Sequence, residues 1–316
     1  MTDSGKLRGK YTGCMLGAAI GDAIGKQNEG LGRKDILSNG YVEDYGIAQA
    51  GCPGDNLRAG DYTDDTEQMI LLARSLIKCK GFDAGDFAER LAKWGADALA
   101  DPARKALVGP SSSVAVARLN SGISWKNSGS SIPSCGSAMR AAPIGLFYTD
   151  LDEVEESAAL SSIPTHNSSG AIAGAVAVAV GVRCALEGME KAEMIKESSF
   201  RASKYDETLG NKIVLSFDKY NEEPDKVFDE LGTSYLVDET VPSAFYCFSR
   251  HFEDPEKAII EAVNAGGDTD SIACITGALC GARHSIDAFP ERWIKGLENR
   301  DIVEHIAGKL FDKSVG

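Results

Sequence analysis

Four glycines spaced four residues apart near the start of the chain constrain its fold more than any other feature. The apolar segment GCMLGAAIGDAIG contains Gly13, Gly17, Gly21 and Gly25, and residues four apart on a helix share one face. That face carries almost no side chains, so another backbone can approach it closely. Since each glycine costs a helix about 1 kcal/mol relative to alanine, the segment needs a compensating partner. We expect a second helix rich in glycine and alanine, at either 170–182 or 272–281.

Helical patterns dominate the rest of the chain. The segment 67–77 has apolar residues at the i, i+3, i+4, i+7 spacing of an amphipathic helix, and further helices are expected at 87–99, 154–160, 176–186, 255–263, 271–282 and 302–311. Strand signals are poor, since only 7% of the residues are aromatic and period-2 alternation is short. No repeat or low-complexity linker divides the chain. We therefore predict a single all-α domain over residues 1–316, with polar loops at 27–61, 120–137 and 205–235.

The charge of the chain restricts its partners. With 33 Lys and Arg against 47 Asp and Glu, the net charge is −14, which disfavours binding to nucleic acid or to anionic membranes. The apolar run 169–182 has fourteen residues, fewer than the ~20 that span a bilayer, so we expect a buried helix and a soluble protein. The charged residues Lys6, Arg8 and Lys10 precede an apolar stretch, but Asp22 interrupts it and no A-x-A-like cleavage site follows.

Eight cysteines are present without a CxxC pair, and most lie among small apolar residues. We expect them to be mainly buried free thiols. That pattern favours a reducing, cytoplasmic compartment.

Two acidic clusters precede apolar helices about 200 residues apart. The first is Thr63-Asp64-Asp65-Thr66, and the second is the segment GGDTDS, which contains Asp268, Asp270 and Ser271. Each cluster has an ordinary explanation as a helix cap, with Asp64 and Glu67 resembling a capping box and Asp270 or Ser271 capping the second helix. If both point into one cavity, however, four carboxylates would repel one another unless cations neutralised them. Such an oxygen-rich set suits two Mg²⁺ or Mn²⁺ ions, and the absence of nearby His or Cys argues against zinc.

Several motifs together resemble the ADP-ribosylglycohydrolase family, which includes dinitrogenase reductase-activating glycohydrolase and the ADP-ribosylserine and ADP-ribosylarginine hydrolases. The matching segments are GCMLGAAIGDAIG with Glu29, YTDDT at 62–66, GSAMRAAPIGL at 136–146, Thr165-His166-Asn167, VPSAFYCFSR at 241–250 and GGDTDS at 266–271. They follow the family's order from residue 9 to about 284. The resemblance implies an all-α fold with an orthogonal helix core and a two-metal site.

The resemblance also implies roles for individual residues. The metal ligands would be Thr63, Asp64, Asp65, Asp268, Asp270 and Ser271; the catalytic carboxylates would be Glu29 and Asp65; and the substrate contacts would be Glu29, Ser134, Cys135, Gly136, Ser137, Met139, His166, Tyr235 and Leu236. Cys135 stands where several members carry Asn, so one polar contact is missing or reassigned. His166 matches a histidine beside the ligand, although a lone His before an apolar helix is as often a cap or core residue. Asp22 is expected to bond backbone or loop groups.

The implied activity is hydrolysis of the bond between ADP-ribose and a modified side chain. Such cleavage at ribose C1″ passes through an oxocarbenium-like state, and a carboxylate such as Glu29 or Asp65 can serve as general base or acid. The segment VPSAFYCFSR resembles the ADP-ribosylserine branch most, so serine is slightly preferred over arginine. Two alternatives stay open: a hydrolase of a small ADP-ribose conjugate, and a non-catalytic relative that binds ADP-ribose or resembles the J1 lens crystallins. We expect a monomer at this core size.

Overall fold

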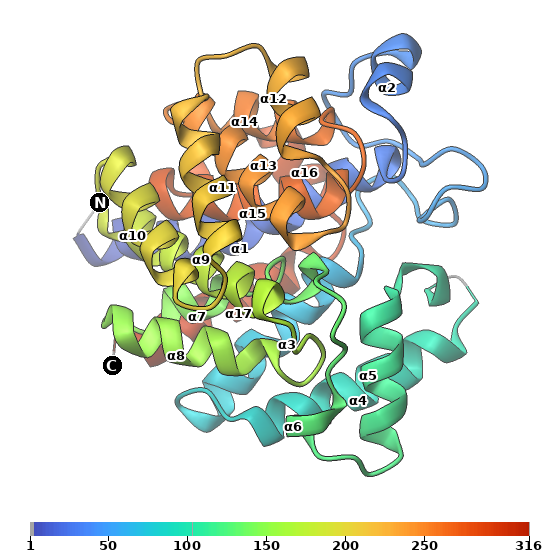
Figure 1. Ribbon diagram of the computed structural model, residues 1–316, viewed down its shortest axis with the longest axis vertical. Helices are drawn as coiled ribbons and strands as arrows, with labels where there is room; N and C mark the ends of the chain where they lie inside the picture. Colours follow the sequence, from blue (N-terminus) through green and yellow to red (C-terminus); the bar gives the residue numbers. More distant parts are fainter. Residues whose placement is uncertain (1–2, 103, 316) are drawn as a thin grey trace.

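Two long helices, α1 (Asp3–Gly25) and α15 (Thr269–His284), run antiparallel through the centre of the protein. The computed structural model describes residues 3–102 and 104–315, and Figure 1 shows that the other helices surround this pair. Within the described residues there is no strand, and only two isolated bridges join extended segments. The predicted all-α fold class is therefore confirmed.

The helices after α1 are α2 (Arg33–Asn39), α3 (Asp64–Cys79), α4 (Ala84–Ala100), α5 (Pro110–Asn120), α6 (Trp125–Ser128), α7 (Ala142–Phe147), α8 (Leu151–Ser162), α9 (Ser169–Glu187) and α10 (Lys191–Ser203). The second half contains α11 (Glu207–Asp218), α12 (Pro224–Leu231), α13 (Val237–Arg250), α14 (Pro255–Val263), α15, α16 (Glu291–Gly296) and α17 (Arg300–Ser314). Short 3-10 turns occur at η1 (Lys26–Asn28), η2 (Lys105–Leu107), η3 (Cys135–Ser137) and η4 (Ile286–Ala288).

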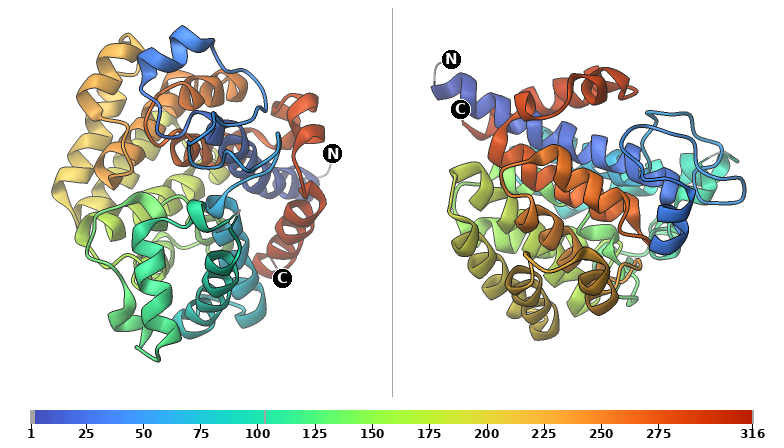
Figure 2. Two further views of the ribbon diagram at one scale, coloured as in Figure 1. Left: turned by 90° about the vertical axis from the view of Figure 1, so that its right-hand side faces the viewer. Right: turned by 90° about the horizontal axis from the view of Figure 1, so that it is seen from above.

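Helix α1 runs alongside α15, as the right-hand view of Figure 2 shows, and its glycine face packs directly against the backbone of α15. A Cβ atom added to Gly17 would stand 2.3 Å from the carbonyl oxygen of Gly277, and one added to Gly277 would stand 2.0 Å from the carbonyl oxygen of Gly17. Gly13 and Gly281 form an equivalent pair one turn away. The predicted close approach is confirmed, and the segment at 272–281 is the partner.

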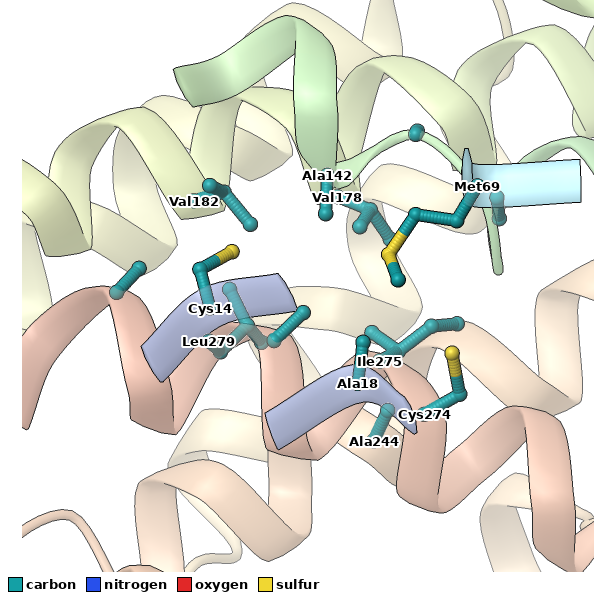
Figure 3. Packing of buried hydrophobic residues seen from close by; sticks show 14 of the residues in the cluster. Cys14, Ala18, Met69, Ala142, Val178, Val182, Ala244, Cys274, Ile275 and Leu279 are labelled. Carbon is teal, nitrogen blue, oxygen red and sulfur yellow. The ribbon is translucent and has the colours of Figure 1, made fainter. Parts of the chain in front are cut away.

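Small side chains fill the core around this pair. Figure 3 shows Cys14 and Ala18 of α1 beside Ile275 and Leu279 of α15, with residues of α3, α7 and α9 above them, including Val178. All five of these side chains are fully or almost fully buried. Because alanine, cysteine and glycine are small, the helices lie close enough to leave no space for larger residues.

The thiols follow the expectation for most positions. All eight cysteines are free; six are buried, whereas Cys52 is half-buried and Cys79 is exposed. The reducing, cytoplasmic compartment stays a prediction.

Helix α9 is longer than its fourteen-residue apolar run. It spans nineteen residues, and among the described residues it is the one helix with the length and composition to cross a membrane. Of its most apolar window, 83% is buried inside the fold. As predicted, this helix belongs to the core.

The prediction of a polar loop at 205–235 is wrong, because helices α11 and α12 occupy most of it. In α11, Leu209 and Ile213 are buried while Glu207, Thr208 and Asn211 are exposed, and the Asp206 side chain caps the helix by accepting from the Leu209 N–H. In α12, Val227 and Leu231 are buried and Pro224 occupies the first turn. Loops 27–61 and 120–137 are likewise interrupted, by α2 in the first and by α6 and η3 in the second.

Candidate active site

The first acidic cluster begins helix α3 and is tied to helix α1 by Asp22. The cap of α3 is Thr63, whose hydroxyl oxygen accepts from the Asp65 N–H, so the expectation of Asp64 as the cap is wrong. The carboxylate of Asp22 accepts from the backbone N–H groups of Thr63 and Thr66 at 3.0 and 3.1 Å. It also accepts from the Thr66 hydroxyl at 2.6 Å. Asp22 therefore bonds the turn before α3, as predicted.

The second cluster begins α15 and meets the first. Gly266 and Gly267 have positive φ angles of 89° and 70°, which glycine adopts without strain, and the chain turns there into the helix. Asp268 occupies the cap position, so the expectation of Asp270 or Ser271 as the cap is wrong. The Ser271 hydroxyl donates to Asp65 Oδ2 at 2.9 Å. This bond joins the two clusters across 206 residues of sequence.

A pocket of about 520 Å³ lies between these helix starts and the segment that contains η3. Its acidic wall is formed by Glu29, Asp64, Asp65, Asp268, Asp270 and Ser271. Ligand pockets in proteins commonly have volumes of about 300–1,000 Å³. The structure thus brings both clusters and Glu29 into one cavity large enough for a substrate.

The pocket also contains most of the residues expected to touch the substrate. Ser134, Cys135, Gly136, Met139, His166 and Tyr235 line the pocket. Three expected site residues do not line it. Thr63 is buried in the cap of α3; the hydroxyl of Ser137 donates to the carbonyl of Ala171 in the core; and Leu236 is the residue that precedes α13.

Sequence reasoning missed an apolar part of the rim. Pro53, Leu107, Val108 and Ile132 line the pocket together with Ala106 and the start of α5 at 109–112. These residues come from two loops, from the end of η2 and from the start of α5, and none of these segments carries a motif. Only the packing of the loops over the cavity identifies them.

Burial and mutual repulsion perturb the acidic wall. Burial, together with the charges of Asp268 and Asp22, raises the pKa of Glu29 to about 8. The pKa values of Asp64, Asp65 and Asp270 are also raised well above the usual range, first by burial and then by neighbouring carboxylates. The cavity therefore concentrates negative charge that protons or cations must neutralise at neutral pH.

The donor set fits divalent cations in its chemistry. Carboxylate and hydroxyl oxygens are the ligands that Mg²⁺ and Mn²⁺ prefer. Within residues 3–102 and 104–315, no three His, Cys, Asp or Glu side chains are grouped closely enough to form a metal site as they stand. The carboxylates line the wall of the cavity, and the cluster's excess negative charge is what a cation would offset.

Cys135, which stands where an asparagine was expected from the resemblance, still makes a polar contact. Its thiol donates to Asp268 Oδ2 at 2.9 Å. The Thr240 hydroxyl donates to the Ser234 carbonyl at 2.7 Å, and its oxygen lies 3.2 Å from Asp268 Oδ2. Burial and the nearby Asp268 charge raise the pKa of the Cys135 thiol well above its usual range. The polar contact at this position is thus directed to an acidic residue of the pocket.

His166 is buried at the pocket wall. Its Nδ1 lies 2.8 Å from the Thr165 hydroxyl oxygen, and its ring lies so close to Gly136 that a Cβ there would stand 2.7 Å from Nε2. Burial and then the charge of Arg140 lower the pKa of His166 to about 3. The imidazole is therefore neutral at physiological pH.

The comparisons with known proteins agree over nearly the whole chain. The profile of the family described as ADP-ribosylglycohydrolase matches residues 3–316. An uncharacterized protein of Archaeoglobus fulgidus is 41% identical, with 96% of each chain covered, and human ADP-ribosylhydrolase ARH3 is 30% identical, covering 96% of this chain and 94% of its own. A solved structure titled ADP-ribosylglycohydrolase-related protein complex has a TM-score of 0.82 and 27% identity, covering 98% of this chain and 99% of its own. The chain belongs to the ADP-ribosylglycohydrolase family.

Proposed function

We propose that this enzyme hydrolyses the glycosidic bond between ADP-ribose and a modified side chain and releases free ADP-ribose. Family membership supports hydrolysis of an ADP-ribosyl bond, and the human relative is named as an ADP-ribosylhydrolase. The observation that carries the proposal is the pocket in which five carboxylates lie beside the polar segment that contains Ser134 and Cys135. A non-catalytic relative would not need that concentration of buried charge.

Glu29 is the residue we assign to proton transfer. It lies in the pocket, where burial raises its pKa, so it can hold a proton and donate it to the leaving group. Asp65 remains the second catalytic candidate, and it accepts a hydrogen bond from Ser271. Substitution of each carboxylate separates their contributions.

We further propose that the two helix starts hold two divalent cations, Mg²⁺ or Mn²⁺. The ligands would be Thr63, Asp64, Asp65, Asp268, Asp270 and Ser271. Bound cations would orient ribose hydroxyls and lower the pKa of a water molecule. The raised pKa values of the buried aspartates support a site that is completed by positive charge.

Once its aspartates hold cations, the pocket favours a neutral leaving group. If four aspartates hold cations and Glu29 carries a proton, no carboxylate among the described lining residues is left to pair with a guanidinium. The rim beside it is apolar, with Pro53 and Leu107. A serine hydroxyl needs no anionic partner, whereas a leaving arginine does. We therefore propose a preference for serine-linked ADP-ribose.

The test is release of ADP-ribose from peptides modified on serine and, separately, on arginine, with Mg²⁺, Mn²⁺ or EDTA. We expect metal-dependent release that is lost in Asp268→Asn and Glu29→Gln and kept in Asp301→Asn, a matched control because Asp301 is exposed far from the pocket. Faster turnover of the arginine peptide would refute the serine preference. No release from either peptide would refute hydrolysis of protein conjugates, and release from a small ADP-ribose conjugate would then favour the alternative substrate.

A further inference from the structure

A fully buried arginine outside the pocket connects its acidic residues with His166. The guanidinium of Arg140 donates to the side-chain oxygen of Gln68, to the carbonyl of Ser161 at 3.1 Å and to the hydroxyl oxygen of Thr165 at 2.6 Å. It also stacks over the ring of Phe87, with 5.1 Å between the guanidinium carbon and the ring centroid. Arg140 itself does not line the pocket. Its effect on a ligand must pass through the residues that it holds.

The bond to Thr165 fixes the direction of the next hydrogen bond. A guanidinium can only donate, so the Thr165 oxygen accepts from Arg140 and its single hydroxyl hydrogen is free to donate elsewhere. Among the described residues, the acceptor within reach of that hydrogen is His166 Nδ1, at 2.8 Å. The Thr165 oxygen could also accept from an Nδ1–H, but its buried hydroxyl hydrogen would then have no acceptor among the described residues. The arrangement that satisfies both groups has Thr165 donating to Nδ1, which then carries no hydrogen.

This direction determines the tautomer of the histidine. A neutral imidazole with an accepting Nδ1 carries its hydrogen on Nε2, and the ring is neutral because burial and Arg140 lower its pKa to about 3. The Nε2 edge lies against Gly136 at the pocket wall, where any Cβ would collide with it. No group in the described part of the chain hydrogen-bonds to Nε2. The ring thus presents a free N–H donor at the cavity.

The same arginine fixes the orientation of an amide on the acidic side. Because the Gln68 oxygen accepts from Arg140, its amide nitrogen must point the other way. That nitrogen donates to Asp64 Oδ2 at 2.7 Å. The Arg140 guanidinium therefore acts on both His166 and Asp64. Through Thr165 it makes His166 Nε2 a donor, and through Gln68 it directs an amide N–H to the Asp64 carboxylate.

We propose that Arg140 is a positioning residue that, through Thr165, locks His166 in the Nε2–H tautomer and so makes it a hydrogen-bond donor to an oxygen of bound ADP-ribose. In this role His166 does not act as a base. The inference rests on the proposed function only for the identity of the ligand. The tautomer itself is a property of the protein alone and can be measured without substrate.

The first test is the ¹⁵N NMR spectrum of the imidazole nitrogens. The chain has four histidines, so the His166 signals can be assigned by their loss in His166→Gln. We expect one neutral Nε2–H tautomer between about pH 6 and 8, retained in Thr165→Ser, which keeps the hydroxyl, and lost to a mixture in Thr165→Val, which cannot donate. We call the hydrogen bonds from Arg140 through Thr165 to His166 the relay. An Nδ1–H tautomer in the unmodified protein, or an unchanged tautomer in Thr165→Val, would overturn it.

The second test is ADP-ribose binding by calorimetry. Loss of a fixed donor to an anionic ligand should weaken the affinity of Thr165→Val by about tenfold, whereas Thr165→Ser should stay close to the unmodified protein. Thr276→Val is the matched control, since Thr276 is an equally buried threonine that bonds backbone carbonyls in α15 away from the pocket. Equal weakening in both valine variants would overturn the positioning role. If the tautomer is as expected but ADP-ribose does not bind the unmodified protein, the proposed function fails while the relay stands.

Discussion

Substitution of Gly17 by alanine tests the contact that holds the two central helices together. The added Cβ would stand 2.3 Å from the carbonyl oxygen of Gly277 and 2.7 Å from Cζ of Phe289, whereas real Cβ atoms keep more than 3.0 Å from such neighbours. The phenyl ring can move, but the carbonyl belongs to the backbone of α15. The two helices would therefore have to separate by roughly 0.7 Å along their whole contact.

Two opposing free energies decide the outcome. Alanine in place of glycine favours a helix by about 1 kcal/mol, while forcing a methyl group into a fully packed contact costs about 1–3 kcal/mol, occasionally more. Here the neighbour is the backbone of α15 and Gly17 is buried, so the upper end of the cost applies. We expect Gly17→Ala to lower the free energy of unfolding by about 2 kcal/mol.

The measurement is urea unfolding followed by circular dichroism, with Gly308→Ala as the matched control. Gly308 lies in α17, and its added Cβ would meet only Arg8 Nη1, the mobile end of a surface side chain. That control should be neutral or more stable by up to about 1 kcal/mol. A Gly17→Ala protein as stable as the unmodified one would refute the argument, as would an equal loss in Gly308→Ala.

Three further predictions concern the site. In EDTA, the free energy of unfolding should fall as the pH rises from about 5 to 8. The reason is that the pKa of Glu29 is about 8 in the folded protein against a usual 4.5, so the folded state holds more protons than the unfolded state. Urea titrations in which the free energy of unfolding rises over this range would contradict the prediction. Thr66→Val should destabilise the protein by about 1.5–3 kcal/mol, since it removes a buried donor to the Asp22 carboxylate, and calorimetric melting against Thr276→Val measures the difference. Iodoacetamide at neutral pH should label the exposed Cys79 first and leave Cys135 unlabelled, because burial keeps that thiol protonated; peptide mass spectrometry showing early modification of Cys135 would count against this assignment.

The sequence predicted the glycine contact but not which helix makes it. Both α9 and α15 are rich in glycine and alanine, and both repeat small residues every four positions, at 173, 177, 181 and 185 in α9 and at 273, 277 and 281 in α15. It is the series in α15 that lies in antiparallel register with the glycines of α1. Helix α9 uses its small face for a different close contact, because a Cβ on Gly145 of α7 would stand 2.2 Å from the Ala179 carbonyl oxygen. The glycine spacing of α1 shows that another backbone can approach it. Whether α9 or α15 does so depends on the packing of the whole core.

The misassigned segment 205–235 shows a second limit. Buried positions in α11 and α12 do follow helical spacing, at Leu209 and Ile213 and then at Val227 and Leu231. Each helix is short and half of its residues are polar, so its apolar stripe is too brief to stand out from a surface loop. The better signals were local: Asp206 at a cap and Pro224 in a first turn.

Some features of the site can also be seen in the sequence, and others only in the structure. The two acidic helix starts were visible because their residues are adjacent in sequence, whereas the bond from Ser271 to Asp65 and that from Cys135 to Asp268 each join residues more than 130 positions apart. The relay from Arg140 to His166 is also tertiary, since the arginine reaches the histidine through Thr165. Motifs name side chains, but the direction of each hydrogen bond follows only from the packed structure.

The contact between α1 and α15 also determines where the charges of the pocket lie. Because the helices are antiparallel, α1 ends where α15 begins, and a Cβ on Gly25 would stand 2.5 Å from the Thr269 carbonyl oxygen and 2.6 Å from Cα of Asp270. The Thr269 hydroxyl then donates to the Gly25 carbonyl at 2.8 Å. Any side chain at position 25 would push the turn that carries Asp268 and Asp270 away from the segment that carries Glu29. The absence of a side chain thus brings together carboxylates that would otherwise repel one another, and the packing energy of the core offsets that repulsion.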